Sequence, residues 1–263
     1  MKKYKIILML IAIGFSSVSC EDYTDGINVD PNNFTSAPGN LIVGQAELVV
    51  VKLSSSNSSR FSGMWVDQFT GTDRQYITVD GYGTTAADYD DEWTDVYASG
   101  AAQARIAKQN GADAGDALLE GVAGIMEAIL IGESASLWGD IPYRTAFDYT
   151  ENEDPTYDPQ AQVFADVQGL LDAALTKVGP DATVASVYGT PIFVGNSANW
   201  SEIIHSLKAR YYLITKEYAL AHAEALQGIS SGDGDLLSAH SNANGARNLY
   251  YQFTIEQRNE YLR

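Results

Sequence analysis

The 263-residue sequence predicts a mainly α-helical protein made of packed helix pairs that are joined by long irregular loops. Several stretches of roughly 13 to 28 residues carry apolar side chains at spacings of three and four, which is the pattern of amphipathic helices. Polar loops containing glycine separate these stretches, and strand-like alternation is scarce. The sequence has no repeat of fixed period, so it only suggests a solenoid.

The first 19 residues are predicted to be a signal peptide. Three lysines precede an apolar run at residues 6–15, which is too short to cross a bilayer because a spanning helix needs about 20 residues. Small residues then lead to Cys20, the only cysteine, which we interpret as a lipidation site whose acyl chains anchor the mature protein. An ordinary cleavage site beside an incidental cysteine is the alternative, because Ser17 stands where a lipobox usually has an aliphatic residue.

The amino-acid composition limits the kinds of partner that the mature chain is expected to bind. Over the full sequence, acidic side chains outnumber basic ones by 34 to 16, and removal of the predicted signal peptide with its three lysines increases this excess. The excess argues against nucleic acid as a partner, because phosphate contacts need clustered lysine and arginine. The residues after Cys20 contain no cysteine, so they form no disulfide or thiolate metal site and the fold depends on a hydrophobic core. Residues 20–40, rich in Asn, Pro and Gly, are predicted to be an extended tether, and residues 41–263 to be the helical domain.

The first part of the helical domain alternates helix and loop. Residues 41–53 are predicted to form a helix that ends in a serine-rich loop at 54–59. A short aromatic segment follows at 61–69. Residues 70–85 mix Gly, Thr and Tyr in a way that fits an irregular loop with one short strand.

Two helices with acidic side chains are predicted next. The first begins near Asp88, where clustered carboxylates complement the helix dipole, and it stops at Asn110 and Gly111. The second covers residues 116–137 and contains glycines that permit close helix contact. Glutamates interrupt its apolar stretch, so a membrane span is rejected here.

Two further helices carry start and stop signals. Residues 158–159 supply an N-cap Asp with Pro at the first helical position, and the helix ends at the Gly-Pro pair of residues 179–180. Asn199 and Glu202 resemble a capping box. The amphipathic helix that follows this box is predicted to continue to Tyr218.

The segment between these helices carries a specific resemblance. The sequence WGDIPY at residues 138–143, followed by YDPQ at 157–160, resembles the signature of the SusD/RagB family. The tether at 20–33, the helix at 93–110 and the helix WSEIIHSLKARYYL at 200–213 are similar to further family segments. All of these matches follow one another in the family order, which argues against coincidence.

The resemblance implies a SusD-like helical fold with four tetratricopeptide-like helix pairs, attached by its lipid anchor to the outer membrane. The acidic pair that follows Cys20, at residues 21–22, resembles an export signal to the outer face of that membrane and so favours a position facing the cell exterior. The family resemblance also implies capture of oligosaccharides or other nutrients as a lid over a SusC-like TonB-dependent porin, with no enzymatic activity and no cofactor. Members of the family are typically about twice as long, so we interpret this chain as an N-terminal half with the C-terminal half missing.

The matched motif residues are interpreted as scaffold and not as a ligand site. Gly139 can end a helix in a left-handed conformation, and Pro142 prevents its continuation. Arg210, on a strongly apolar helix, is expected to be solvated or paired with carboxylates. The residues given this structural role are Trp93, Trp138, Gly139, Asp140, Pro142, Tyr143, Trp200 and Arg210.

The candidate ligand site lies in the segment before the helix that begins near Asp88. Neutral carbohydrate is held by stacking on exposed aromatic rings and by hydrogen bonds from polar side chains to its hydroxyls. This segment supplies both kinds of side chain, and the resemblance implies that a loop in this region contributes to the ligand face. The candidate ligand-binding residues are Asp73, Arg74, Gln75, Tyr76, Tyr82 and Tyr89. Local packing of these tyrosines is the alternative.

The sequence contains no recognised catalytic or metal-binding motif. His205 and His222 fall in helix and His240 in a loop, and the Asp-Gly-Asp at 233–235 lacks the later ligands of a calcium loop. Asp91 and its acidic neighbours fit a helix start better than a glycosidase carboxylate pair. Two rival functions remain open: a helical-repeat adaptor that binds peptide or protein, and, ranked below it, a glycoside hydrolase.

Overall fold

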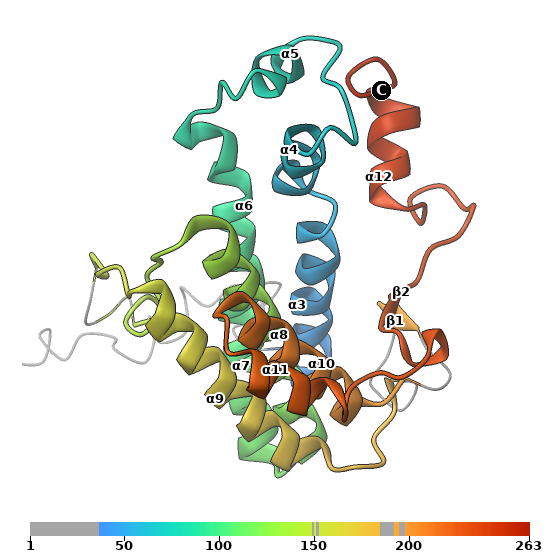
Figure 1. Ribbon diagram of the computed structural model, residues 1–263. Helices are drawn as coiled ribbons and strands as arrows, with labels where there is room; N and C mark the ends of the chain where they lie inside the picture. Colours follow the sequence, from blue (N-terminus) through green and yellow to red (C-terminus); the bar gives the residue numbers. More distant parts are fainter. Residues whose placement is uncertain (1–36, 149, 151–152, 185–191, 195–197) are drawn as a thin grey trace, which may run out of the picture. The chain divides into compact units, whose positions relative to one another are not determined.

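The computed structural model (Figure 1) describes most of the chain, namely residues 37–148, 150, 153–184, 192–194 and 198–263. Nearly all of these fall in one compact unit, Pro38–Arg263. The predicted signal peptide, the lipidation site Cys20 and most of the predicted tether lie outside the described residues. The unit is mainly α-helical, as the sequence predicts. Within the described part, strand is limited to a short antiparallel pair, β1 (Phe193–Val194) and β2 (Leu237–Ser238).

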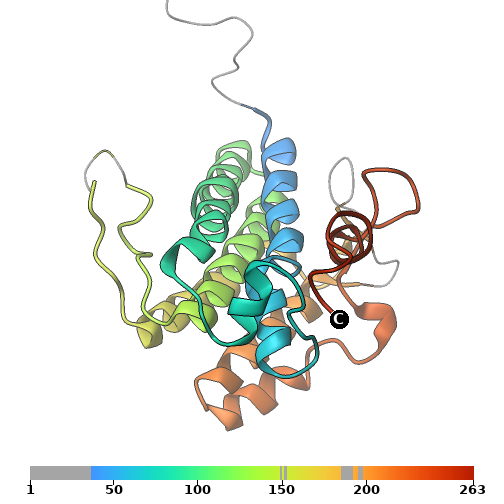
Figure 2. The same ribbon diagram turned by 90° about the horizontal axis from the view of Figure 1, so that it is seen from above.

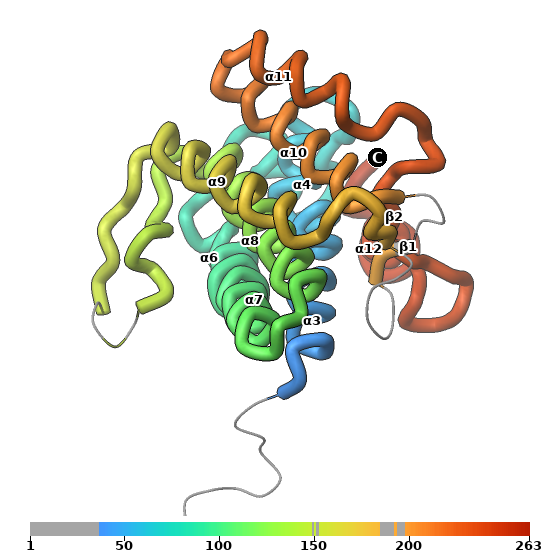
Figure 3. Tube along the Cα trace, turned by 90° about the horizontal axis from the view of Figure 1, so that it is seen from below, coloured from blue at the N-terminus to red at the C-terminus, as the bar shows by residue number. Residues whose placement is uncertain are grey.

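The helix-pair body contains the longest helices of the described chain. It consists of α3 (Gly39–Leu53), α7 (Ala102–Ala114), α8 (Ala117–Trp138), α9 (Gln160–Val178), α10 (Trp200–Ile214) and α11 (Tyr218–Ala225). Helix α8 lies at the centre and packs against α3, α7, α9 and α10 (Figure 3). Helices α10 and α11 form a further pair. Buried residues of these helices, mostly aliphatic, make up the main hydrophobic core.

Helix α8 is tightly enclosed because small residues let its neighbours approach. Gly132 faces the ring of Tyr211 on α10, and an added Cβ would collide with that ring. The predicted ends of this helix are confirmed to within one residue, and Asp116 is the N-cap. Among the described residues, no helix has the length and apolar character that crossing a membrane requires.

The helix predicted from Asp88 begins earlier and ends later than expected. It starts with the 3-10 turn η1 (Ala86–Tyr89), α6 (Asp90–Thr94) and the π-helical turn η2 (Asp95–Ala101), and it continues into α7. The predicted stop at Asn110 and Gly111 is wrong: Gly111 lies where α7 approaches α8, and an added Cβ would be 2.7 Å from the Glu120 nitrogen. The helix ends at Gly115 with a φ of +70°, a conformation that glycine adopts without strain.

The ends of α9 and α10 differ from the prediction in detail. Asp158 does not cap α9, which begins two residues later, and its carboxylate instead accepts two backbone hydrogen bonds from the end of the WGDIPY segment and the residue after it. Asn199 caps α10 as predicted, but through the second helical amide and not the third, which a capping box uses. Helix α10 ends before Tyr218, because the chain turns at Lys216, where φ is +64°.

Shorter elements from two distant parts of the chain form the aromatic cap. It consists of α4 (Asn57–Trp65), α5 (Gln75–Asp80), α12 (Leu249–Tyr251), the π-helical turn η5 (Gln252–Gln257) and residues 258–263. Reciprocal backbone hydrogen bonds between Thr70 and Arg263 join the two parts. The C-terminal end of the chain accordingly lies beside the cyan segment around α4 in Figure 2. The buried core of the cap comprises Phe61, Met64, Tyr76, Val79, Tyr261 and Leu262.

Packing in the cap overrides two predictions of irregular structure. Residues 70–85 were expected to form a loop with a strand, but they contain α5, because Tyr76 and Val79 lie on one helical face and are both buried in the core of the cap. The Thr, Ile and Val of this segment have a local preference for strand, but burial of the helical face against the core of the cap overrides it. The loop predicted at 54–59 is also partly helical, since α4 begins at Asn57.

Candidate functional site

The six candidate ligand residues lie in or beside the aromatic cap, but they differ in exposure. Tyr76 is only 2 % exposed, and its ring contacts those of Phe61, Phe253 and Tyr261 in the core. Its hydroxyl accepts a hydrogen bond of 2.8 Å from Nε of Arg60. A buried ring offers no face to a sugar, so the structure places Tyr76 beneath the surface of this region and not on it.

The other five candidates are partly or fully exposed. Asp73, Arg74 and Gln75 lie at the start of α5, where the Asp73 carboxylate accepts a hydrogen bond of 2.9 Å from the Arg74 backbone nitrogen. Tyr89 is half-buried and packs edge-on against Phe61, with 5.9 Å between ring centroids. Its phenol therefore borders the core, while the start of α5 presents polar groups to solvent.

A pair of stacked rings, Trp65 and Tyr82, is the most distinctive surface feature of the cap. The ring centroids are 5.8 Å apart and the ring planes differ by 23°. Nε1 of Trp65 donates a hydrogen bond of 2.9 Å to the Val79 carbonyl, which fixes the indole, while Tyr82 is 70 % exposed. Sequence reasoning found Tyr82 but missed Trp65. The aromatic segment at 61–69 held a signal, yet nothing in the sequence pairs residue 65 with residue 82.

Backbone strain is concentrated around this pair. Asp67, Arg74 and Tyr82 are non-glycine residues with positive φ, at 58°, 50° and 62°. Such conformations cost roughly 1–3 kcal/mol each and persist only where surrounding contacts hold them. In the described chain, the one other non-glycine example is Lys216, between α10 and α11. Strain gathered in one short segment is typical of a binding site whose backbone is fixed before the ligand arrives.

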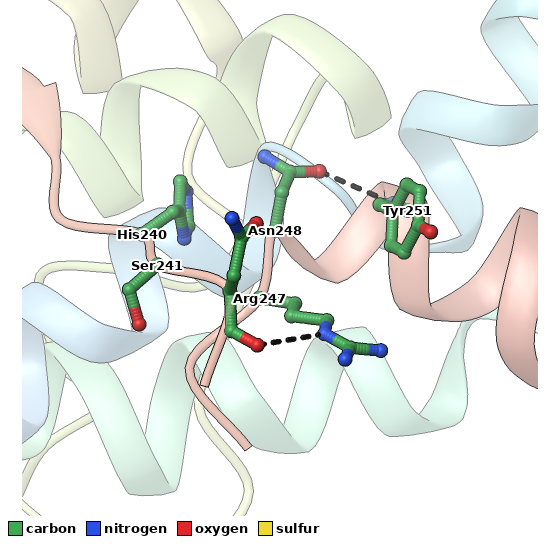
Figure 4. Close-up of a pocket in the computed structure, with 6 residues that line it drawn as sticks. His240, Ser241, Arg247, Asn248 and Tyr251 are labelled. Carbon is green, nitrogen blue, oxygen red and sulfur yellow. Dashed lines mark hydrogen bonds between the residues drawn. The ribbon is translucent and has the colours of Figure 1, made fainter. Parts of the chain in front are cut away.

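A polar pocket of about 380 Å³ opens at the start of α12 (Figure 4). Arg247 donates a hydrogen bond of 3.3 Å from Nε to the Asn242 carbonyl, and the Asn248 side chain caps α12. The pocket borders the cap, because Tyr250 of α12 stacks on Phe69. Amide, guanidinium, imidazole and phenol groups, all suitable partners for hydroxyls, line it: His240, Ser241, Asn242, Arg247, Asn248 and Tyr251. Sequence reasoning missed it, since this irregular stretch has no periodicity.

Comparison with known families assigns the chain. A sequence model of the SusD-like family, described as starch-binding and associating with the outer membrane, matches residues 31–254. The chain belongs to the SusD-like family. No curated protein matches it.

Solved structures agree with the SusD-like fold. A SusD/RagB family protein from Bacteroides thetaiotaomicron matches with a TM-score of 0.70 at 18% identity, over 83% of this chain and 48% of that one. A SusD homologue from Bacteroides fragilis has a TM-score of 0.59 at 19% identity, over 81% and 46%. A chitin-binding protein has a TM-score of 0.60 at 22% identity, over 76% and 46%. The chain therefore spans about half the length of these structures.

The WGDIPY segment of this SusD-like chain joins α8 to α9. Gly139 ends α8 with a φ of +81°. The Asp140 carboxylate accepts a hydrogen bond of 2.8 Å from the backbone nitrogen of Gln160, the first residue of α9. The Tyr143 hydroxyl donates to the buried carboxylate of Glu127 at 3.0 Å. Each of these contacts fixes the corner between two helices.

The remaining motif residues also contact neighbouring elements. The rings of Trp93 and Trp138 lie 5.2 Å apart and connect α6 to the end of α8. Trp200, at the start of α10, is fully buried in the main core. Arg210 is exposed and pairs with Glu133 at 3.0 Å. The scaffold role expected of these residues from the sequence stays a prediction.

Several titratable side chains near the cap and on α10 are engaged in contacts between helices. Glu92 is buried, and its carboxylate accepts a hydrogen bond of 2.6 Å from the Ser58 backbone nitrogen, which ties α6 to α4. His205 on α10 hydrogen-bonds Glu224 on α11 at 2.6 Å, and Lys208 pairs with the same carboxylate. Across the residues that the structure describes, no group of three or more His, Cys, Asp or Glu side chains could hold a metal ion.

Proposed function

We propose that this SusD-like chain binds a neutral oligosaccharide reversibly at the cell surface and does not alter it chemically. The observation that carries the proposal is the exposed ring of Tyr82, stacked on the half-buried ring of Trp65 in a strained and well-supported segment. Sugar rings pack their C–H faces on such flat apolar surfaces. The description of the family as starch-binding supports a glycan as the ligand, and so does the chitin-binding protein among the similar structures.

Three groups of side chains form the proposed site, and each has a different role in holding the sugar. Trp65 and Tyr82 provide the ring surface, and Asp73, Arg74 and Gln75 provide hydrogen-bonding partners for sugar hydroxyls. The aromatic core of the cap holds this surface from beneath. Because the surface is already ordered, little conformational entropy is lost when the ligand binds. The polar pocket beside α12 offers partners for hydroxyls of a further sugar.

Calorimetric titration of the full chain against a panel of neutral oligosaccharides tests the proposed site. Tyr82→Ala should weaken binding about tenfold or more, because it removes the exposed half of the ring surface, without lowering the unfolding midpoint. Tyr218→Ala is the matched control, since Tyr218 is 62 % exposed on α11, outside the cap, and it should bind as the wild type does. Undiminished binding by Tyr82→Ala would contradict the site. Saturable peptide binding with no response to glycans would support the adaptor instead.

The proposal assigns no catalysis to the chain. The two carboxyls of a glycosidase must face each other across a cleft, about 5 to 9.5 Å apart. Asp91 lies in the first turn of α6, and the neighbouring Glu92 is buried against Ser58. Incubation with a bound oligosaccharide should therefore release no new reducing ends. Release that Asp91→Asn abolishes would establish a hydrolase and overturn this part of the proposal.

The proposal also places the protein at the outer membrane, anchored through Cys20 and facing the cell exterior. The lysines and the short apolar run before Cys20 support export, and the family description supports outer-membrane association. Several acyl chains on one residue make a lasting anchor, because each buried methylene adds about 0.8 kcal/mol. Radiolabelled palmitate should enter the wild-type chain and not Cys20→Ala. Equal labelling of both chains, or of neither, would contradict lipid attachment at Cys20.

A SusC-like TonB-dependent porin is the proposed partner. The support is the family resemblance and the logic of a binder that changes nothing chemically, since a captured oligosaccharide needs an importer. A tagged chain isolated from detergent-solubilised outer membranes should carry such a porin with it. Isolation of the chain alone, with its lipid anchor and glycan binding intact, would argue against a stable complex.

A further inference from the structure

A groove on the helix-pair body is formed by elements that the proposed glycan site does not use. It lies between the η2 and α7 segment on one side and the residues after WGDIPY on the other, and its volume is about 490 Å³. This volume is in the range of small-molecule sites. Its lining includes Tyr97, Ala98, Ala102, Arg105, Ala146 and Phe147.

One wall of the groove is a pair of fixed aromatic rings. Tyr97 and Phe147 stack with 5.9 Å between centroids and 27° between ring planes. The Tyr97 hydroxyl donates a hydrogen bond of 2.7 Å to the Pro142 carbonyl, which holds this wall against the WGDIPY corner. Ala98 and Ala102 carry only a methyl group each, so they leave the space beside the rings open. This space leaves room for a ring-shaped ligand alongside the aromatic wall.

Arg105 brings positive charge to the groove. Its guanidinium carbon lies 4.1 Å from the centre of the Phe147 ring and 5.1 Å from that of Tyr143. Nε of Arg105 donates to Glu127 at 2.6 Å, and Lys108 pairs with the other oxygen of the same carboxylate. Glu127 is fully buried, whereas the Arg105 side chain is 33% exposed. Two cations therefore share one carboxylate, and this cluster carries one positive charge in excess.

We propose that this groove binds a ring that carries a carboxylate, specifically a uronic acid residue of an acidic glycan. The planar guanidinium of Arg105 matches a carboxylate in geometry as well as charge, and the Tyr97 and Phe147 wall suits the C–H face of the sugar. That the ligand is a glycan rests on the proposed function, but the groove is a different site from the aromatic cap and its ligand is acidic and not neutral. The local excess charge stands out in a chain with a formal net charge of −18.

Titration of the full chain with an oligogalacturonate, and with its methyl ester of equal length, tests the groove. The free acid should bind and the ester should bind about tenfold more weakly or not at all, because esterification removes the charge that Arg105 recognises. Ala98→Trp should abolish binding of the acid by filling the space beside the rings, and an exposed position such as Ala98 tolerates a large side chain. Arg105→Lys should weaken binding while leaving a cation beside Glu127.

Matched measurements separate this inference from the proposed function. Tyr82→Ala should leave oligogalacturonate binding unchanged, and Ala98→Trp should leave neutral oligosaccharide binding unchanged. Three results would overturn the uronate site. The acid and the ester could bind with equal affinity, the acid could still bind to both Ala98→Trp and Arg105→Lys, or the acid could fail to bind at all. If Ala98→Trp lowers the unfolding midpoint, the comparison of acid with ester in the wild-type chain decides the question without it.

Discussion

The helix-pair body and the aromatic cap are stabilised by different kinds of contact. The core of the body is mostly aliphatic and comes largely from helices that follow one another along the chain, such as α8 and α9. The core of the cap is largely aromatic and joins residues 57–89 to the C-terminal residues 249–263. The scaffold therefore follows from local pattern, whereas the surface proposed to bind glycan depends on contacts between distant segments.

The largest expected effect distinguishes the two cores directly. Trp200→Ala removes a fully buried ring from the body and should lower the free energy of unfolding by about 3–5 kcal/mol, as urea denaturation would measure. Tyr76→Phe in the cap removes only the hydroxyl that bonds Arg60 and should cost about 1 kcal/mol. Similar losses of unfolding free energy in the two variants would contradict the view that the body contributes more to stability than the cap.

The body also contains a buried carboxyl with a strong dependence on pH. Burial raises the pKa of Glu47 in α3 from 4.5 to about 7. Because the folded state holds this proton more tightly than the unfolded chain, the contribution of Glu47 to stability is present below pH 4.5 and is lost as the pH rises through 7. Glu47→Gln should therefore be more stable than the wild type at pH 8, by up to about 3 kcal/mol.

Urea denaturation of both chains at pH 4 and pH 8 measures this effect. The difference in unfolding free energy between wild type and Glu47→Gln should grow with pH across that window. A difference that is independent of pH would show that the carboxyl is not held neutral by the body.

Two glycine substitutions test how closely α8 is enclosed. Gly132→Ala places a methyl group against the ring of Tyr211 and should destabilise the protein by about 1–3 kcal/mol. Gly44→Ala in α3 is the matched control, because no atom lies within 4 Å of its added Cβ, and it should stabilise by about 0.4–1 kcal/mol. Thermal unfolding would measure both. A neutral Gly132→Ala would mean that α10 can move away from α8.

The smallest expected effect compares strain in the two regions. Lys216→Gly should stabilise the protein by about 0.5–1 kcal/mol, because glycine adopts positive φ freely, and glycan binding should not change. Tyr82→Gly relieves the same kind of strain in the cap but removes the exposed ring, so it should lose affinity. Calorimetry and thermal unfolding of the two variants give both quantities. Loss of glycan binding in Lys216→Gly would link the body to the site.

Sequence reasoning succeeded where periodicity and local capping decide the structure. The extent of helix α8, the end of α9 at Gly179 and the start of α10 at Asn199 were all predicted. The end of α7 was misplaced, because Gly111 serves close packing and not termination. Capping and stop signals of this kind depend on about one turn of backbone. They mislead when a residue such as Gly111 is needed for packing against another helix.

The candidate site was only partly predictable for the same reason. Tyr82 was found because exposed aromatic residues in loops are expected to bind sugars, but Tyr76 in the same segment proved to be buried. Its burial depends on Phe253 and Tyr261, which are far away in sequence. The partner of Tyr82, Trp65, was missed because stacking between the end of a helix and a turn leaves no periodic trace.

Hydrogen–deuterium exchange of the full chain, with and without a saturating neutral oligosaccharide, tests most directly whether the ligand binds on the aromatic cap. Slower exchange should appear at residues 65–84, around the Trp65 and Tyr82 rings, while amides of α8 to α11 exchange as before. Protection confined to the helix-pair body, or no change at 65–84 when the ligand is bound, would contradict the account.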